Sequence, residues 1–87
     1  MITQKLKDAM IYLYGRWQDE SQYEDFHEYI SYIKKRLPKG ATKMTFTKRP
    51  FEMKFWVGTK KFGVRVMATR IMFGQLNRQR RGRSRSR

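Results

Sequence analysis

The sequence predicts an α+β fold, with two N-terminal helices packed on a small antiparallel sheet and a basic tail after it. Apolar residues recur every three or four positions up to about residue 37 and alternate residue by residue between 43 and 69. They are absent after residue 76. Helical patterns followed by strand patterns are typical of a sheet with helices on one face. We therefore expect one domain over residues 1–76 and a disordered Arg-rich tail over 77–87.

The first predicted helix covers residues 3–18. Its apolar side chains fall on one face at helical spacing, namely Ile2, Leu6, Ala9, Met10, Leu13 and Trp17. Thr3 is a suitable N-cap residue because its hydroxyl can accept a hydrogen bond from a free backbone N–H. Gly15 weakens the last turn, since glycine costs about 1 kcal/mol relative to alanine inside a helix.

The second predicted helix covers residues 22–37. Ser21 and Glu24 match a capping box at its start, and Pro38 and Gly40 end it. Its apolar face consists of Phe26, Ile30, Ile33 and Leu37. Acidic residues stand in its first half and basic residues in its last turn, as the helix dipole favours. The acidic patch is therefore explained by the helix ends rather than by a functional site.

Three strands are predicted after the helices, over residues 43–48, 51–58 and 62–69. Residues 58–61 contain a glycine followed by polar residues and indicate a hairpin turn between the last two strands. The stretch from Arg70 to Leu76 fits either a further strand or a short helix. The predicted sheet is thus a hairpin with one more strand beside it.

The formal net charge is +14, and it is unevenly distributed along the chain. Residues 1–28 hold six acidic and three basic residues, a net charge of −3, whereas residues 29–87 hold eighteen basic residues and one acidic residue, a net charge of +17. Charge on this scale indicates a polyanionic partner. Neither helix has the wholly basic polar face of an interfacial membrane helix, so we expect nucleic acid and no membrane partner.

Two basic regions are the candidate nucleic-acid-binding sites. In the tail every basic residue is an arginine, whose planar guanidinium can bind phosphate with two hydrogen bonds and stack on bases. In the hairpin, alternation puts Lys54, Trp56 and Arg65 on the face opposite the helices, where the indole can stack on an unpaired base. An equally weighted alternative is that Trp56 covers a dimer interface or packs under the ambiguous segment after Arg70. The full set of predicted binding residues is Lys43, Lys48, Arg49, Lys54, Trp56, Lys60, Lys61, Arg65, Arg70, Arg78, Arg80, Arg81, Arg83, Arg85 and Arg87.

Other classes of function have little support in the sequence. With no cysteine and one histidine, a Cys- or His-based metal site is excluded, and no Gly-rich phosphate loop is present. His27 lies among acidic residues of a helix and forms no recognisable catalytic arrangement. We expect a protein that is not an enzyme and has no metal or cofactor. The chain is loosely similar to RelE-type toxin ribonucleases in size, charge and element order. It lacks their first strand, and no motif residue matches.

A further resemblance concerns the arginine run Arg78–Arg87 and the basic hairpin around Lys54-Phe55-Trp56. In size and charge the chain is similar to RNA-binding antidefence proteins of T-even phages, which inhibit the ToxN ribonuclease of the ToxIN toxin–antitoxin system. The resemblance covers the chain only as a type, so it assigns no functional residue. It implies a phage inhibitor that acts through RNA on a host nuclease in the bacterial cytoplasm.

The sequence as a whole predicts a cytosolic, non-catalytic nucleic-acid-binding protein with RNA favoured over DNA and low sequence specificity. The alternative is an inhibitor that binds a host nucleic-acid enzyme directly, through its acidic helix pair or by placing the hairpin in the enzyme's groove. A ribonuclease is a third hypothesis. Because a core of this size is only marginally stabilising, we also expect that a homodimer buries leftover apolar surface.

Overall fold

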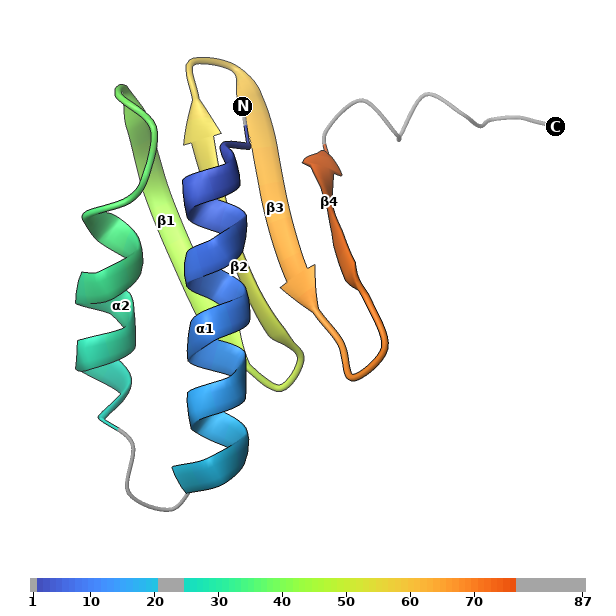
Figure 1. Ribbon diagram of the computed structural model, residues 1–87. Coiled ribbons are helices and arrows are strands. Elements are labelled where there is room, and N and C mark those ends of the chain that lie inside the picture. The colour runs from blue at the N-terminus through green and yellow to red at the C-terminus, as the bar shows by residue number, and fades with distance from the viewer. Residues whose placement is uncertain (1, 21–24, 77–87) are drawn as a thin grey trace, which may run out of the picture.

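The computed structural model describes residues 2–20 and 25–76, which form two layers, a pair of helices and a sheet (Figure 1). The predicted α+β class is confirmed, and within the described residues the sheet has four antiparallel strands in the order β1-β2-β3-β4. The elements are α1 (Gln4–Glu20), α2 (Phe26–Lys34), β1 (Ala41–Lys48), β2 (Phe51–Val57), β3 (Lys60–Val66) and β4 (Ile71–Gln75). The tail over 77–87 lies outside the described residues.

The helix α1 begins where the sequence indicates. The Thr3 hydroxyl accepts a hydrogen bond from the Leu6 N–H at 3.1 Å, which confirms Thr3 as the capping residue. Gly15 does not end the helix, which continues to Glu20 rather than stopping at residue 18. Trp17, beyond the glycine, stacks on Phe51 with ring centroids 5.4 Å apart. Tertiary packing of this turn offsets the low helix propensity of glycine.

The helix α2 is shorter than the predicted range of 22–37. Its N-cap is Asp25, whose carboxylate accepts a hydrogen bond from the His27 N–H at 2.9 Å. The predicted capping box of Ser21 and Glu24 lies outside the described residues. The helix ends at Lys34, three residues before the predicted end. A proline ring disfavours the helical conformation of the residue that precedes it. The chain accordingly leaves the helix through turns before Pro38.

The strands also differ at their ends from the predicted ranges. β1 begins at Ala41 rather than 43, and β2 ends at Val57 rather than 58. A two-residue turn at Gly58 and Thr59, with Gly58 at φ +62°, lets Lys60 already pair with Val57, so β3 starts before the predicted 62.

β3 ends at Val66 instead of residue 69, because a tight turn follows it. The Met67 N–H donates to the Arg70 carbonyl at 2.8 Å and reverses the chain. The ambiguous stretch after Arg70 is consequently a fourth strand, which pairs with β3 along its whole length.

The core lies between the helices and the inner face of the sheet, and Phe51 is at its centre. Leu6, Met10 and Leu13 of α1 are fully buried there, as are Tyr29 and Ile33 of α2 and Met53, Phe55 and Val64 of the sheet. The Phe51 ring lies 5.2–6.2 Å from four other aromatic rings, those of Tyr14, Trp17, Tyr29 and Phe46. These rings come from both helices and β1. A single residue at the start of β2 therefore joins the two layers.

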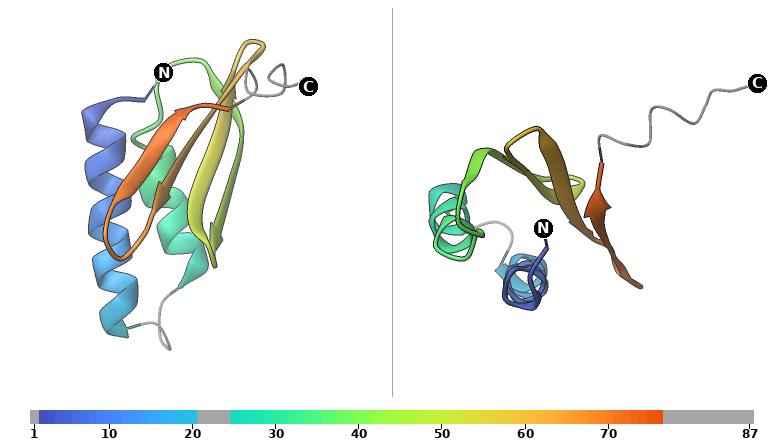
Figure 2. Two further views of the ribbon diagram at one scale, coloured as in Figure 1. Left: turned by 90° about the vertical axis from the view of Figure 1, so that its right-hand side faces the viewer. Right: turned by 90° about the horizontal axis from the view of Figure 1, so that it is seen from above.

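The helices do not cover the whole sheet. Figure 2 shows α2 beside β1, α1 near the middle of the sheet, and β4 lying beyond both helices. Phe73 of β4 faces the helix side of the sheet but is consequently 50% exposed, whereas Phe51 is 2% exposed. Neither of the two described helices is long and apolar enough to cross a membrane.

Replacing Phe51 by alanine should test this description of the core. Truncation of a buried phenylalanine costs about 3–5 kcal/mol, a large part of the stability of a small domain. Phe73→Ala is the matched control, and because that ring is half exposed we expect a loss of about 1 kcal/mol. Urea denaturation followed by circular dichroism measures both. Equal losses for the two variants would contradict the central role of Phe51.

Candidate nucleic-acid interface

The strand register decides which side chains share the outer face of the sheet. Glu52 pairs with Arg65, Lys54 with Gly63, and Trp56 with Lys61 across β2 and β3. Because Phe51, Met53 and Phe55 are buried against the helices, the residues between them point the other way. Lys54, Trp56 and Arg65 thus share the face on which the sequence alternation placed them.

Trp56 lies between two lysines on this face. Its ring centroid is 5.8 Å from the Lys61 Nζ and 5.9 Å from the Lys43 Nζ. Lys61 is its cross-strand partner on β3, because the hairpin turn is shorter than predicted. Lys43 sits in β1 where the pairing register shifts between Thr42 and Thr45, and its φ is +54°. The result is an indole with an ammonium group on either side, which attracts anions to an aromatic surface.

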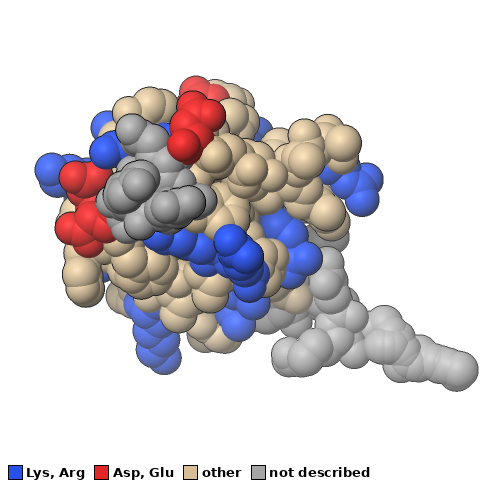
Figure 3. All heavy atoms as spheres, turned by 90° about the horizontal axis from the view of Figure 1, so that it is seen from below, with Lys and Arg blue, Asp and Glu red and all other residues tan. Residues whose placement is uncertain are grey.

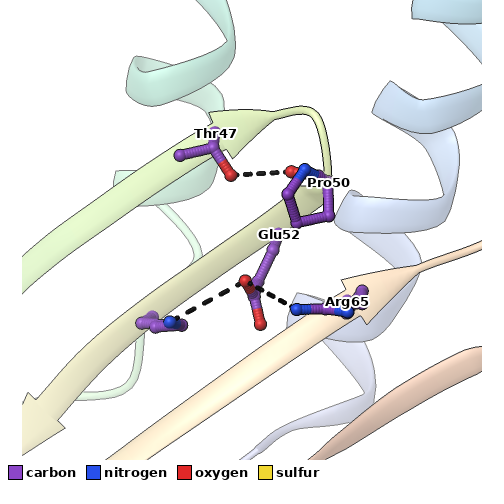
Figure 4. A network of polar contacts seen from close by, with 5 residues as sticks. Thr47, Pro50, Glu52 and Arg65 are labelled. Carbon is purple, nitrogen blue, oxygen red and sulfur yellow. Dashed lines mark hydrogen bonds and ion pairs between the residues drawn. The ribbon is translucent and has the colours of Figure 1, made fainter.

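Glu52 organises the basic residues farther along the same face (Figure 4). Its carboxylate lies 3.4 Å from the Arg65 guanidinium and 3.8 Å from the Lys54 ammonium. The Glu52 side chain is 15% exposed, whereas those of Lys54 and Arg65 are 38% and 42% exposed. The carboxylate is therefore largely covered by the two basic side chains, which stay open to solvent. Glu52 holds them in position and cancels one positive charge.

A depression of about 310 Å³ lies beside this cluster, towards β4. The Leu76 side chain closes over Gly63, and a Cβ atom at Gly63 would lie 2.8 Å from the Leu76 Cδ1. The sequence did not predict this part of the face, because the apolar residues between 70 and 76 follow neither a clear helical nor a clear strand periodicity. Gly63 and Gly74 could have indicated it, since a glycine inside a strand often marks a position where another group approaches the backbone closely. The lining residues are Glu52, Gly63, Arg65, Met72, Phe73, Gly74, Gln75 and Leu76.

Lys48 and Arg49, which the sequence placed on the same basic surface, lie on the helix side instead. Lys48 pairs with the inward-facing Phe51, and its Nζ is 5.1 Å from the ring centroid of Tyr29. The Arg49 guanidinium lies 5.5 Å from the ring centroid of Trp17. The expectation that these residues extend the outer face was wrong. They follow the inward side of β1 and the turn after it.

The other two predicted residues that the structure describes lie at the ends of β3 rather than on the outer face. Lys60 pairs with Val57, which is in the inward-facing set, and Arg70 lines a depression between α1 and the β3–β4 turn. Lys60 is exposed at the end of the β2–β3 hairpin, next to Lys61. Arg70 lies in the turn that leads into β4, on the opposite end of β3. The six tail arginines lie outside the described residues. The structure therefore brings together Lys43, Lys54, Trp56, Lys61 and Arg65, with Lys60 at their margin.

Apart from Glu52, the acidic side chains that the structure describes lie on or next to the helices. Asp25 caps α2, and Glu28 forms an ion pair with Arg16 of α1 at 2.9 Å. Figure 3 views the molecule from below, and its acidic side chains gather in two places while basic side chains spread across the centre. Among the described residues, the sheet therefore has Glu52 as its one acidic side chain, whereas the others belong to the helix layer.

No protein-family model matches this sequence, and neither a curated protein nor a solved structure matches it. Among residues 2–20 and 25–76, no group of three or more potential metal ligands comes together. Fold and surface together define a small basic α+β protein with an aromatic and basic sheet face.

The electrostatic surroundings of Trp56 can be tested by fluorescence quenching in a Trp17→Phe background. We expect iodide to quench Trp56 more strongly than caesium does, relative to free tryptophan amide, because the two ammonium groups concentrate anions. Changing both Lys43 and Lys61 to glutamine should remove most of the difference. Lys5→Gln and Lys7→Gln together provide a control with the same change in charge. An equal response to iodide and caesium in the parent protein contradicts the described arrangement.

Proposed function

We propose that this protein binds single-stranded RNA on the outer face of its sheet, with low sequence specificity and without catalysis. The observation that carries the proposal is Trp56 between Lys43 and Lys61 on an open β-sheet face. Bases stack on aromatic side chains whatever their sequence, while lysines beside the ring contact the phosphates that flank a stacked base. The arrangement suits an unpaired nucleotide better than a base pair inside a duplex.

Lys54 and Arg65 extend the surface along the strands from Trp56. Both remain exposed although both contact Glu52, so an RNA phosphate can approach them on the solvent side. Phosphate contacts position a nucleic acid and carry no sequence information, which supports low specificity. The described helices present no basic face suited to a major groove, and this favours RNA over duplex DNA. The arginines from Arg78 onwards follow Leu76 closely in sequence and would add further phosphate contacts.

The proposed biological role follows the resemblance to phage antidefence proteins. We propose that the RNA-bound protein inhibits a host toxin or defence ribonuclease in the bacterial cytoplasm. RNase treatment of a complex purified from host cells distinguishes this role from direct protein binding, because a nuclease held through RNA is released. Labelled RNA should also remain intact in the presence of the purified protein. Cleavage at high protein concentration would instead support the ribonuclease hypothesis.

Binding should weaken by orders of magnitude as the salt concentration rises, because the affinity is mainly electrostatic. Changing Lys54 or Lys61 to glutamine should reduce the slope of log K against log salt by about 0.7 each, the value for one phosphate contact on a single strand. Lys5→Gln on α1 removes the same charge away from the face and should leave the slope nearly unchanged. Fluorescence anisotropy with single-stranded RNA, duplex RNA and duplex DNA measures these effects. Tighter binding of duplex DNA at every salt concentration contradicts the proposal.

Glu52→Gln should have the opposite effect and tighten RNA binding. The substitution raises the charge of the face by one and frees Lys54 and Arg65 from their counter-charge. We expect a gain of a few-fold at low salt and a smaller gain at high salt, because the effect is screened. Asp8→Asn on α1 gives the same change in net charge as a control. If the Glu52 variant instead binds RNA more weakly, the contacts of Glu52 serve to position the Lys54 and Arg65 side chains for binding.

Stacking is tested separately with two substitutions of Trp56. Trp56→Leu removes the aromatic ring and should lower the affinity by about 5- to 150-fold, since stacking on one base contributes about 1–3 kcal/mol. Trp56→Phe keeps an aromatic ring and should lose far less. Thermal unfolding of both variants checks that the fold is intact. If leucine and phenylalanine reduce the affinity equally, Trp56 has no stacking role.

A further inference from the structure

The last strand of the sheet has an open edge. β4 pairs with β3 on one side, and no other strand of residues 2–20 and 25–76 pairs with its second side. The Arg70 carbonyl accepts a hydrogen bond from the Met67 N–H, just after β3, at 2.8 Å, and the Leu76 N–H donates to the Lys61 carbonyl of β3 at 2.7 Å. Because backbone directions alternate along an antiparallel strand, the backbone groups of Ile71 and Phe73 point away from β3. These groups are in position to pair with a further strand.

Nothing in the sequence of β4 protects this edge. Edge strands are usually blocked by charged residues, proline or a bulge. β1, at the other edge, has two lysines and an irregularity at Lys43, whose φ is +54°. β4 reads Ile-Met-Phe-Gly-Gln and has neither a charge nor a proline. The two edges of the sheet therefore differ, and only β4 is suited to pairing.

The side chains around this edge are apolar and about half exposed. Phe73 on the inner face is 50% exposed and Met72 on the outer face is 48% exposed. A second depression of about 350 Å³ lies between α1 and the β3–β4 turn, lined by residues that include Ile11 and Ile71. Ile11 is itself 48% exposed. Apolar surface beside an open strand edge is characteristic of an interface.

The strand is complementary to a second copy of itself. In an antiparallel pair with a two-fold axis at Phe73, the two Phe73 rings would be neighbours, and Met72 of each copy would face Gly74 of the other. Gly74 leaves room for the methionine, since a Cβ atom there would meet no heavy atom within 4 Å. Residues 77–87 contain no apolar side chain that would match those of β4. We propose that β4 pairs with β4 of a second copy, and that this pairing forms a homodimer.

Charge opposes this dimer and makes it dependent on conditions. Each copy has a net charge of +14, and the Lys7 Nζ lies 4.0 Å from the ring centroid of Phe73. Arg65 is the cross-strand partner of Met72. The repulsion is reduced by salt or by a bound polyanion. The dimer therefore becomes more stable as salt rises, which is the reverse of the salt dependence of RNA binding.

The pairing also extends the proposed RNA-binding surface, and this part of the inference rests on the proposed function. Two sheets joined through β4 form one continuous sheet, so that the outer faces with Trp56 and Arg65 lie on the same side. One RNA strand can then contact both copies and offset their mutual repulsion. Binding to RNA long enough for two copies is consequently cooperative.

Sedimentation velocity of the full chain without nucleic acid tests the interface independently of RNA. We expect monomer at about 0.1 M NaCl and an increasing fraction of dimer at about 0.5 M NaCl. Met72→Lys should weaken the dimer at least about tenfold at the higher salt concentration, because it places a charge opposite Gly74 of the second copy. Thr45→Lys, on the outer face of β1, adds the same charge and should change the dimer less than about twofold. Hydrogen exchange should show that the amides of Ile71 and Phe73 become protected in the dimer.

Two alternative results would overturn the proposal. If Met72→Lys and Thr45→Lys weaken the dimer equally, general charge rather than β4 controls association. A protein that stays monomeric at all salt concentrations has no such interface. If the monomeric protein also binds a synthetic peptide of alternating Glu and Val, and the Ile71 and Phe73 amides become protected, the edge of β4 instead binds an acidic strand of another protein. A salt-stabilised dimer in a protein that binds no RNA would support the interface and refute only the proposed function.

Discussion

The arrangement of this protein depends on the aromatic packing around Phe51 at the start of β2. Its ring contacts aromatic residues of both helices and of β1, so it fixes the position of the sheet against the helix layer. Because side chains alternate along a strand, burial of Phe51 also commits Met53 and Phe55 to the core and Lys54 and Trp56 to solvent. A shift of one residue would reverse both sets. The core and the proposed binding face are therefore two results of one register.

The same packing sorts the basic residues into two groups. Lys48 and Arg49 lie against aromatic rings at the helix side, where they contribute to the packing of the domain. Lys43 and Lys61 lie beside Trp56, which points to the opposite face of the sheet, away from the helices. Identical residue types thus have different surroundings according to the side of the sheet they occupy. A high net charge indicates a polyanionic partner, and the sheet determines which of the charges can meet it.

The proposals for RNA binding and for pairing through β4 concern adjacent parts of one sheet. Arg65 illustrates the connection, since it contacts Glu52 on the RNA-binding face and is also the cross-strand partner of Met72 at the edge of the sheet. A polyanion on the outer face reduces the repulsion that keeps two copies apart. The opposite salt dependences of the two interactions separate them experimentally, although they share residues.

The sequence was enough to predict the fold class, the cap of α1, the alternation in β2 and the division of charge, because each depends on residues close together along the chain. It misplaced the start and end of α2, the end of β3 and the side chains of Lys48 and Arg49. It also left β4 ambiguous, because five residues with two adjacent exposed apolar side chains have no clear period. These points depend on contacts between residues far apart along the chain. Strand pairing with β3 made residues 71–75 a strand, the short turn at Gly58 brought Lys61 to Trp56, and the limited reach of two helices left β4 uncovered.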